Sequence, residues 1–161
     1  MTESFKILAE FIKDMSSETP DIESYLFVKE RISKYHLNIN INSKGLKNKM
    51  IEVCTTLKYE DKEDNIKKSY FEIVYITIIK INDNINDKKT LEKILLCDVQ
   101  NAIYPRLEKG LLNLIHNSGF PNVQFGKSLQ VTINGHGDWC GIGYTGSGST
   151  RKISSAIVAS W

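Results

Sequence analysis

The sequence predicts an α+β domain, in which a four-stranded antiparallel sheet is followed by a short and a long helix packed on one face of the sheet. Apolar residues alternate with period two in four stretches of the first half. After a polar linker at 82–89 the period changes to that of a helix. Strands followed by helices, without alternation between the two, indicate helices on one side of an antiparallel sheet.

The first three strands are expected at 5–13, 34–42 and 50–60, each with one apolar face. These faces consist of Phe5, Ile7, Ala9 and Phe11; of Tyr35, Leu37, Ile39 and Ile41; and of Ile51, Val53 and Leu57. Successive side chains of a strand point to opposite faces, so each of these strands is expected to have one face on the core and one on solvent.

The fourth strand, expected at 69–81, is apolar on both faces. One face carries Phe71, Ile73, Tyr75, Ile79 and Ile81, and the other carries Val74, Ile76 and Ile78. Both faces of such a strand need a cover. Because a small domain with few helices supplies one cover, we expect the second to come from another subunit or from a bound client.

Two helical stripes follow the linker. The short helix has Leu91, Ile94, Leu95 and Val99 on one side, with Thr90 as its N-cap. The long helix is expected to open at Pro105, in its first turn, and its stripe is Leu107, Leu111, Leu114 and Ile115. Gly119 suits the left-handed C′ position, with Phe120 folding back on Leu114 or Ile115 before Pro121 stops the helix. This stripe could pack on the sheet or on another subunit's helix.

Composition limits the function classes. A length of 161 residues suits one domain, and a net charge of +2 gives no general attraction to nucleic acid or anionic lipid. The apolar stretch 70–81 is too short to span a bilayer, and the first residues lack a secretory signal pattern. Cys54, Cys97 and Cys140 are an odd, scattered set, as expected for reduced thiols in the cytoplasm.

Residues 127–161 differ in composition from residues 1–126. They hold six of the ten glycines and only four charged residues, so we expect a separate, poorly ordered tail. GIGYTG at 141–146 matches a dinucleotide fingerprint but lacks the acidic residue about twenty positions later. His136 and Cys140 have no further ligands to complete a metal site. We therefore expect no metal, no cofactor and no catalytic site, and a structural role for His116 near the helix C-terminus.

Three patches between residues 5 and 126 form a recognisable pattern. The first is FIKDMSSETPDIESYLF, a strand followed by Ser-x-Glu-x-Pro. The second is the succession of four strands with Glu72 inside the last. The third is IYPRLEKGLLNLIHNSGFPNVQF, a long helix with its closing segment. Together the three patches resemble the protein-export chaperone SecB family, whose main helix closes on a similar Gly-x-Phe-Pro.

The resemblance implies an ATP-independent cytoplasmic chaperone that holds unfolded preproteins in apolar grooves and delivers them to the SecA translocation ATPase. It also implies a homotetramer, a dimer of dimers. The groove residues are then Phe27, Ile32, Tyr70 and Tyr104. The SecA-binding residues are Asp14, Glu18 and Glu72, the first two of which could instead lie in a solvated turn. The oligomer interface comprises Phe71, Ile73, Tyr75, Leu107, Leu111 and Leu114.

Some features depart from the family pattern. The segment KERIS at 29–33 lacks a large aromatic residue, Glu108 replaces a commonly basic residue, and residues 1–126 are neutral where the family is acidic. These departures leave room for a SecB-like chaperone dedicated to one client, such as an antitoxin. A nucleotide-binding protein that uses the glycine-rich tail and a homo-oligomeric module without clients are more remote alternatives.

Overall fold

A computed structural model describes residues 4–61, 69–85, 87–125, 129–133, 138–142 and 151–158, with side chains up to residue 125 except that of Lys88. The strands are β1 (Phe5–Glu18), β2 (His36–Gly45), β3 (Met50–Glu60), β4 (Tyr70–Ile81), β5 (Leu129–Ile133), β6 (Asp138–Ile142) and β7 (Arg151–Val158). The α-helices are α1 (Ile22–Arg31), α2 (Lys88–Lys93) and α3 (Val99–Asn117). A 3-10 turn (Ile32–Lys34) follows α1, and a π-helical segment (Ile94–Asp98) joins α2 to α3.

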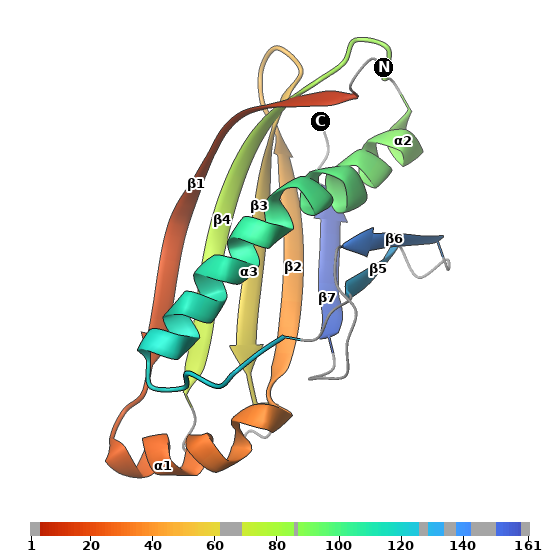
Figure 1. The fold of residues 1–161 in the computed structure, drawn as a ribbon. Coiled ribbons are helices and arrows are strands. Elements are labelled where there is room, and N and C mark those ends of the chain that lie inside the picture. Colours follow the sequence, from red (N-terminus) through yellow and green to blue (C-terminus); the bar gives the residue numbers. More distant parts are fainter. Residues whose placement is uncertain are drawn as a thin grey trace.

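The predicted four-stranded antiparallel sheet is confirmed. The order in the main sheet is β1-β4-β3-β2-β7, and β1 to β4 are antiparallel neighbours. The helices α2 and α3 run across one face of this sheet, and α1 lies across one of its ends (Figure 1). The α+β fold class with a short and a long helix on one face is therefore confirmed.

The core lies between the sheet and α3. The inner faces of β2, β3 and β4 alternate as the sequence predicts, so that Leu37, Val53 and Ile73 are fully buried. The helical stripe Leu107, Leu111 and Ile115 is also fully buried. The apolar face of the sheet, with period two, packs against the apolar stripe of α3, with period 3.6. The two surfaces form one apolar layer.

The edge strand β1 differs from the prediction because two β-bulges shift its register. Ile7 is opposite Ile79 on the inner face, but Ala9 is opposite Ile78 and Phe11 is opposite Ile76, both on the outer face. A bulge inserts one residue and so moves the following side chains to the other face. The prediction that Phe5, Ile7, Ala9 and Phe11 share one face is therefore wrong.

The outer face of β4 carries Val74, Ile76 and Ile78, as predicted. Ile76 is buried, whereas Val74 and Ile78 are half-buried. The helices α2 and α3 both lie on the other face of the sheet (Figure 1). This chain covers the inner face of the strand with its own helix, and its described helices leave the outer face open.

The helical run from Lys88 to Asn117 starts earlier than predicted. Asp87, not Thr90, caps α2, because its carboxylate accepts from the backbone N–H groups of Lys89 and Thr90. The Thr90 hydroxyl also donates to this carboxylate, and these bonds lower the pKa of Asp87. Pro105 lies inside α3 and does not open it. The proline is tolerated there because both it and Asn101, whose carbonyl loses a partner, face solvent.

The end of α3 matches the prediction. Gly119 has φ 107°, and the N–H of Phe120 bonds the carbonyl of Ile115 while that of Gly119 bonds the carbonyl of His116. These two bonds are the Schellman motif, in which an apolar residue after the glycine packs back on the helix. The buried ring of Phe120 therefore fixes how the chain leaves α3.

The described residues beyond 125 contain three strands that the sequence analysis did not predict. β5 and β6 form a two-stranded antiparallel sheet, and β7 pairs in parallel with β2. The division of the chain at residue 127 stays a prediction. Most of GIGYTG lies outside the described residues, as does His136.

Two of the cysteines can be compared with the prediction. Cys54 is a free thiol, but Cys97 is in a disulfide, so the prediction of reduced cysteines is wrong for Cys97. Among the described residues, no helix has the length and apolar character needed to cross a bilayer.

Candidate functional site: an apolar groove beside the end of the long helix

The main candidate site is an apolar groove of about 420 Å³ at the end of the sheet where α1 lies. We define this groove by its lining side chains. Ile32 and Ser33 come from the 3-10 turn, Lys29 from α1 and Tyr59 from the end of β3, and the opposite wall is residues 119–124. The groove is therefore formed by α1, the 3-10 turn, β3 and the segment after α3.

The α1 wall is held by polar contacts at both ends. Asp21 caps α1 by accepting from the N–H of Ser24 at 2.7 Å. The Tyr59 hydroxyl donates to the Ile32 carbonyl at 2.9 Å, where the helix passes into the 3-10 turn. Arg31 forms a bidentate salt bridge with Asp61, with Nε–Oδ2 at 2.8 Å and Nη2–Oδ1 at 3.3 Å. These bonds fix the wall relative to β3.

The opposite wall is the segment that leaves α3. The Phe120 ring packs against Tyr25, with centroids 5.2 Å apart, and against Phe71 at 5.8 Å. The Tyr25 hydroxyl donates to the Gly119 carbonyl at 2.9 Å. Further along, the Phe125 ring lies edge-on to Tyr59, with centroids 5.3 Å apart. Aromatic packing therefore joins this wall to α1, β3 and β4.

The lining of the groove suits a ligand with apolar side chains. Its lining surface is mostly apolar, and of the described residues that line it Lys29 alone is charged. Among the described residues, no group of three His, Cys, Asp or Glu side chains is placed to hold a metal ion. Burying apolar surface contributes roughly 25 cal/mol per Å², which favours a ligand with apolar side chains.

A second exposed apolar surface lies along the edge strand β1. Leu8, Phe11, Ile12 and Met15 are 40–50% exposed, and among the described strands β1 pairs with β4 alone. A long, apolar edge strand offers free backbone donors and acceptors to another chain. Within the described sheet, β1 therefore leaves both apolar side chains and backbone groups exposed.

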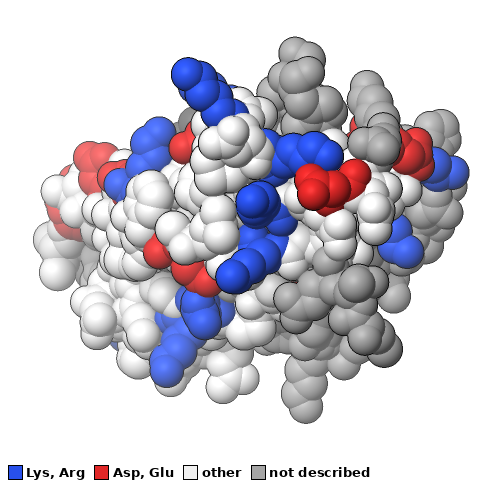
Figure 2. Space-filling model, turned by 90° about the horizontal axis from the view of Figure 1, so that it is seen from above, with Lys and Arg blue, Asp and Glu red and all other residues white. Residues whose placement is uncertain are grey.

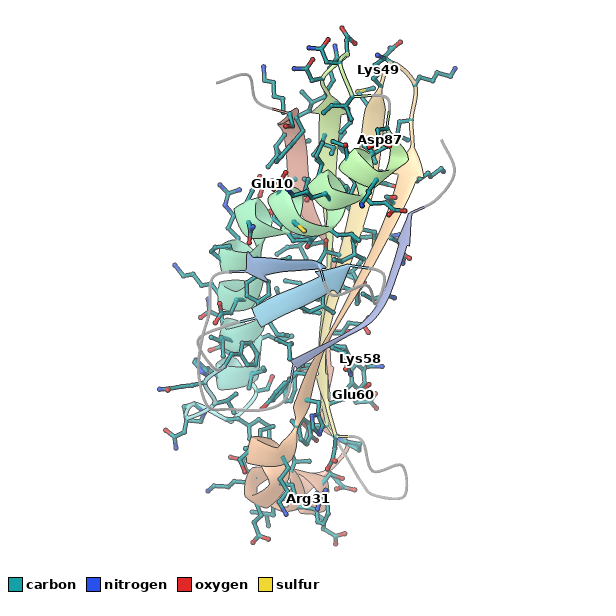
Figure 3. All side chains as sticks on the ribbon, turned by 90° about the vertical axis from the view of Figure 1, so that its right-hand side faces the viewer. Glu10, Arg31, Lys49, Lys58, Glu60 and Asp87 are labelled. Atoms are coloured by element: carbon teal, nitrogen blue, oxygen red, sulfur yellow. The ribbon has the colours of Figure 1, made fainter. Side chains whose placement is uncertain are left out.

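A polar cluster ties β1 to α3. Both the Tyr75 hydroxyl and the Arg106 guanidinium donate to the Glu10 carboxylate. Burial, and then the bond to Glu10, raises the pKa of Tyr75. Glu10 lies on the side of α3, whereas Lys58 and Glu60 project from the opposite side of the sheet (Figure 3). This cluster holds the exposed strand against the body of the domain.

A family model and a curated relative give the family of this chain. Residues 1–127 match the family model described as preprotein translocase subunit SecB. A putative protein-export protein SecB of Pelagibacter ubique is 54% identical over 132 residues, which covers 82% of this chain and 94% of that protein. This chain belongs to the SecB family.

A more distant SecB relative agrees with this assignment, and a solved structure shares the fold. The protein-export protein SecB of Bartonella bacilliformis is 24% identical over 117 residues, with 73% of this chain and 72% of that protein covered. A solved structure of a SecB-like chaperone of Mycobacterium tuberculosis, in complex with a peptide from the HigA1 antitoxin, has a TM-score of 0.55. That alignment covers 76% of this chain and 89% of the other at 9% identity, so it shows the fold alone.

The four residues predicted for a SecB client groove do not come together. Ile32 lines the groove described above. Phe27 is half-buried on α1, where the Arg31 guanidinium lies over its ring at 5.6 Å. Tyr70 is on the other side of the sheet, beneath Lys58, and Tyr104 is buried in α3. The binding roles of these residues stay predictions.

The three predicted SecA-binding residues do come together. The register places Asp14 opposite Val74 and Ser16 opposite Glu72, so Asp14, Glu18 and Glu72 share the outer face. Lys58 is opposite Glu72 on the next strand. On the end of the molecule seen in Figure 2, acidic and basic side chains are also interspersed, so the described residues there form no field of one sign.

The residues predicted for an oligomer interface lie inside this chain. Phe71, Ile73 and Tyr75 face α3 and are buried, as are Leu107 and Leu111. Leu114 is half-buried. Most of these side chains belong to the core of this chain, so they could affect assembly only by supporting a surface that another subunit contacts. Their role in the oligomer interface stays a prediction.

Sequence reasoning missed the helix α1 and with it most of the groove. The signal was present in Tyr25, Val28 and Ile32, which recur at i, i+3 and i+7 and pack against the core. Asp21 at the N-cap, directly after Pro20, is a second signal. The sequence indicated only that Tyr59 lies at the end of a strand. Its place in the groove wall depends on the segment after α3, which is distant in the sequence.

Proposed function

We propose that this SecB family member is an ATP-independent chaperone that binds unfolded preproteins in the apolar groove. The observation that carries the proposal is the cavity between the 3-10 turn and residues 119–124, lined by Ile32, Tyr59, Phe120 and Val123. An extended client can place large apolar side chains there, and its backbone can pair with a free strand edge. Binding of this kind requires no catalytic group, no nucleotide and no cofactor.

Suppression of aggregation tests this proposal. Light scattering of a chemically unfolded protein, diluted into buffer without ATP, is expected to fall when this chain is present at near-stoichiometric amounts. Ile32→Ser is expected to weaken the suppression several-fold, because it removes apolar surface from the groove. Leu46→Ser, an exposed apolar residue in the hairpin at the other end of the sheet, is the matched control. Absence of suppression by the wild-type chain would contradict the proposal.

We also propose that the chain assembles as a homotetramer, a dimer of dimers, in which β1 is one of the contacts. The exposed apolar side chains on the edge of the described sheet support this proposal. Native mass spectrometry is expected to give the mass of four chains. Phe11→Lys is expected to lower that mass, whereas Leu46→Lys is expected to leave it unchanged. A monomeric wild-type chain would refute the assembly.

The partner that receives the client is proposed to be the SecA ATPase, in the cytoplasm, with docking at Asp14, Glu18 and Glu72. Their position on one face of β1 and β4 supports this site. Replacing all three by their amides is expected to weaken SecA binding and its salt dependence. Glu52→Gln, on the same face of β3 opposite Ile78, is the control. SecA binding that the triple variant leaves unchanged would move the docking site elsewhere.

A single dedicated client, such as an antitoxin, remains the alternative to general export. Capture of many different precursors by the full chain would favour export, and capture of one protein would favour the alternative. Nucleotide binding that depends on residues 127–161 would favour the more remote interpretation as a nucleotide-binding protein.

A further inference from the structure

One residue of α3 holds the groove wall of residues 119–124 at two points, Gly119 and Val123. The backbone carbonyl of His116 accepts from the N–H of Gly119 at 3.2 Å, where the wall begins. The Nε2 atom of the same residue lies 2.8 Å from the carbonyl oxygen of Val123, near the far end of the wall. His116 therefore closes a loop of residues onto the last turn of the helix.

The chemistry of the second contact sets the protonation of the ring. A carbonyl oxygen can only accept, so Nε2 must carry a proton and donate it. Both the neutral imidazole protonated at Nε2 and the imidazolium satisfy this requirement. The contact is a structural tie between the last turn of α3 and the wall.

A second polar contact at Val123 is longer than the one from His116. The backbone bond from the Val123 N–H to the Phe120 carbonyl is 3.4 Å long. The bond from Tyr25 holds the wall at Gly119, where it begins. Val123 and Phe125 are buried by apolar packing, with Phe125 against Tyr59. The His116 ring thus makes a short polar contact at the Val123 end.

We propose that His116 is a positioning residue of the apolar groove. Its bond to Val123 holds the wall away from the 3-10 turn, so that the cavity is open before a client arrives. A preformed site spares the client the entropy cost of ordering the wall, and so increases affinity. This inference rests on the proposed chaperone function and adds a residue that contacts no client itself.

Two substitutions in the full chain separate the bond from the shape of the ring. His116→Leu has similar bulk but no donor, and His116→Gln can place an amide N–H near the position of Nε2. The probe is fluorescently labelled, reduced and carboxymethylated α-lactalbumin, which is permanently unfolded. We expect about tenfold weaker binding for His116→Leu, and binding within about threefold of wild type for His116→Gln. His36→Leu, on the outer side of β2, is the control and is expected to bind as wild type does.

Hydrogen exchange provides a readout that does not require a client. The amides of Phe120–Phe125 are expected to exchange faster in His116→Leu than in wild type, while those of β3 and α3 stay unchanged. Equal protection of these amides, or equal loss of binding in the Leu and Gln variants with native mass and urea midpoint retained, would overturn the inference. If wild type does not bind the probe, the proposed function fails, and the exchange data still decide the role of His116.

Discussion

The hydroxyl group of Tyr25 donates a 2.9 Å hydrogen bond to the carbonyl oxygen of Gly119, 94 residues later in the chain. The glycine lets the two segments approach this closely. A Cβ atom on Gly119 would lie 2.7 Å from Cε2 of Tyr25, and φ at Gly119 is 107°. The first helix and the end of the last helix therefore meet at a position that accepts only glycine without strain.

Gly119→Ala is expected to destabilise the domain by about 2–3 kcal/mol, because it adds both the unfavourable φ and the clash with Tyr25. Urea denaturation measures the change in free energy of unfolding. Ser118→Ala, one residue earlier at φ −86°, is the control and is expected to cost about 1 kcal/mol or less. Equal effects of the two substitutions would contradict the strain at Gly119.

Two adjacent threonines of β3 are expected to respond differently to the same substitution. The Thr55 hydroxyl is fully buried and lies 3.2 Å from Oε1 of Gln100, whose amide donates to the Leu95 carbonyl in the π-helical segment. Thr55→Val keeps the shape but deprives the buried amide of a partner, at a cost of about 1–2 kcal/mol. Thr56→Val, on the outer face, should cost less than about 0.5 kcal/mol in the same urea titration. A reversed order would show that the polar contact does not stabilise the helix.

The pair of Arg31 and Asp61 is expected to matter more than exposed ion pairs. The Asp61 side chain is 6% exposed and that of Arg31 is 20% exposed. Arg31→Met removes the charge that compensates a buried carboxylate, with an expected loss of about 2–3 kcal/mol of stability. Lys49→Met breaks the exposed pair with Asp83 and should cost less than about 0.5 kcal/mol. Thermal unfolding of the two variants checks the difference, and similar melting temperatures would count against a stabilising buried pair.

The stability of the domain is expected to fall above pH 10. Burial raises the pKa of Tyr35 to about 12, from an ordinary value of about 10. The folded state keeps this proton longer than the unfolded state, so the stabilisation is complete below pH 10 and is lost as the pH rises to about 12. The loss amounts to about 2–3 kcal/mol for this group. Urea titrations at about pH 9 and about pH 11.5, on either side of the ordinary tyrosine pKa, check this expectation.

Tyr35→Phe is the matched variant for this pH dependence. It removes the titrating hydroxyl together with its 2.8 Å bond to the Ser69 carbonyl. The variant should be less stable than wild type at the lower of the two pH values, and its stability should decline less between them. Parallel declines for the two proteins would assign the alkaline transition to other groups.

The sequence predicted the parts of this fold in which a local pattern decides the structure. The alternation of Leu37, Ile39 and Ile41 along β2 places each of these side chains in the core. Gly119 was predictable because a left-handed residue after a helix is most often glycine. In both cases neighbouring residues carry the whole signal.

The parts that were missed depend on contacts between distant segments. The bulges in β1 arise from pairing with β4, and they decide which face carries Phe11. Tolerance of Pro105 inside α3 depends on which side of the helix faces solvent. The groove needs Tyr59 from β3 and Val123 from the segment beyond α3, residues that no sequence window contains together.

The edge position of β1 has a geometric consequence for what the assembly can hold. If two copies pair antiparallel through β1, a twofold axis places their two grooves at opposite ends of the shared strands. Each groove is lined by residues of α1 and its 3-10 turn, and α1 lies at the end of the sheet where β1 ends (Figure 1). A strand of 14 residues is about 45 Å long. A polypeptide long enough to span that distance would bind in both grooves and gain avidity, whereas a short peptide would bind in one groove. The assembly could then prefer long clients over short peptides without recognising a sequence motif in them.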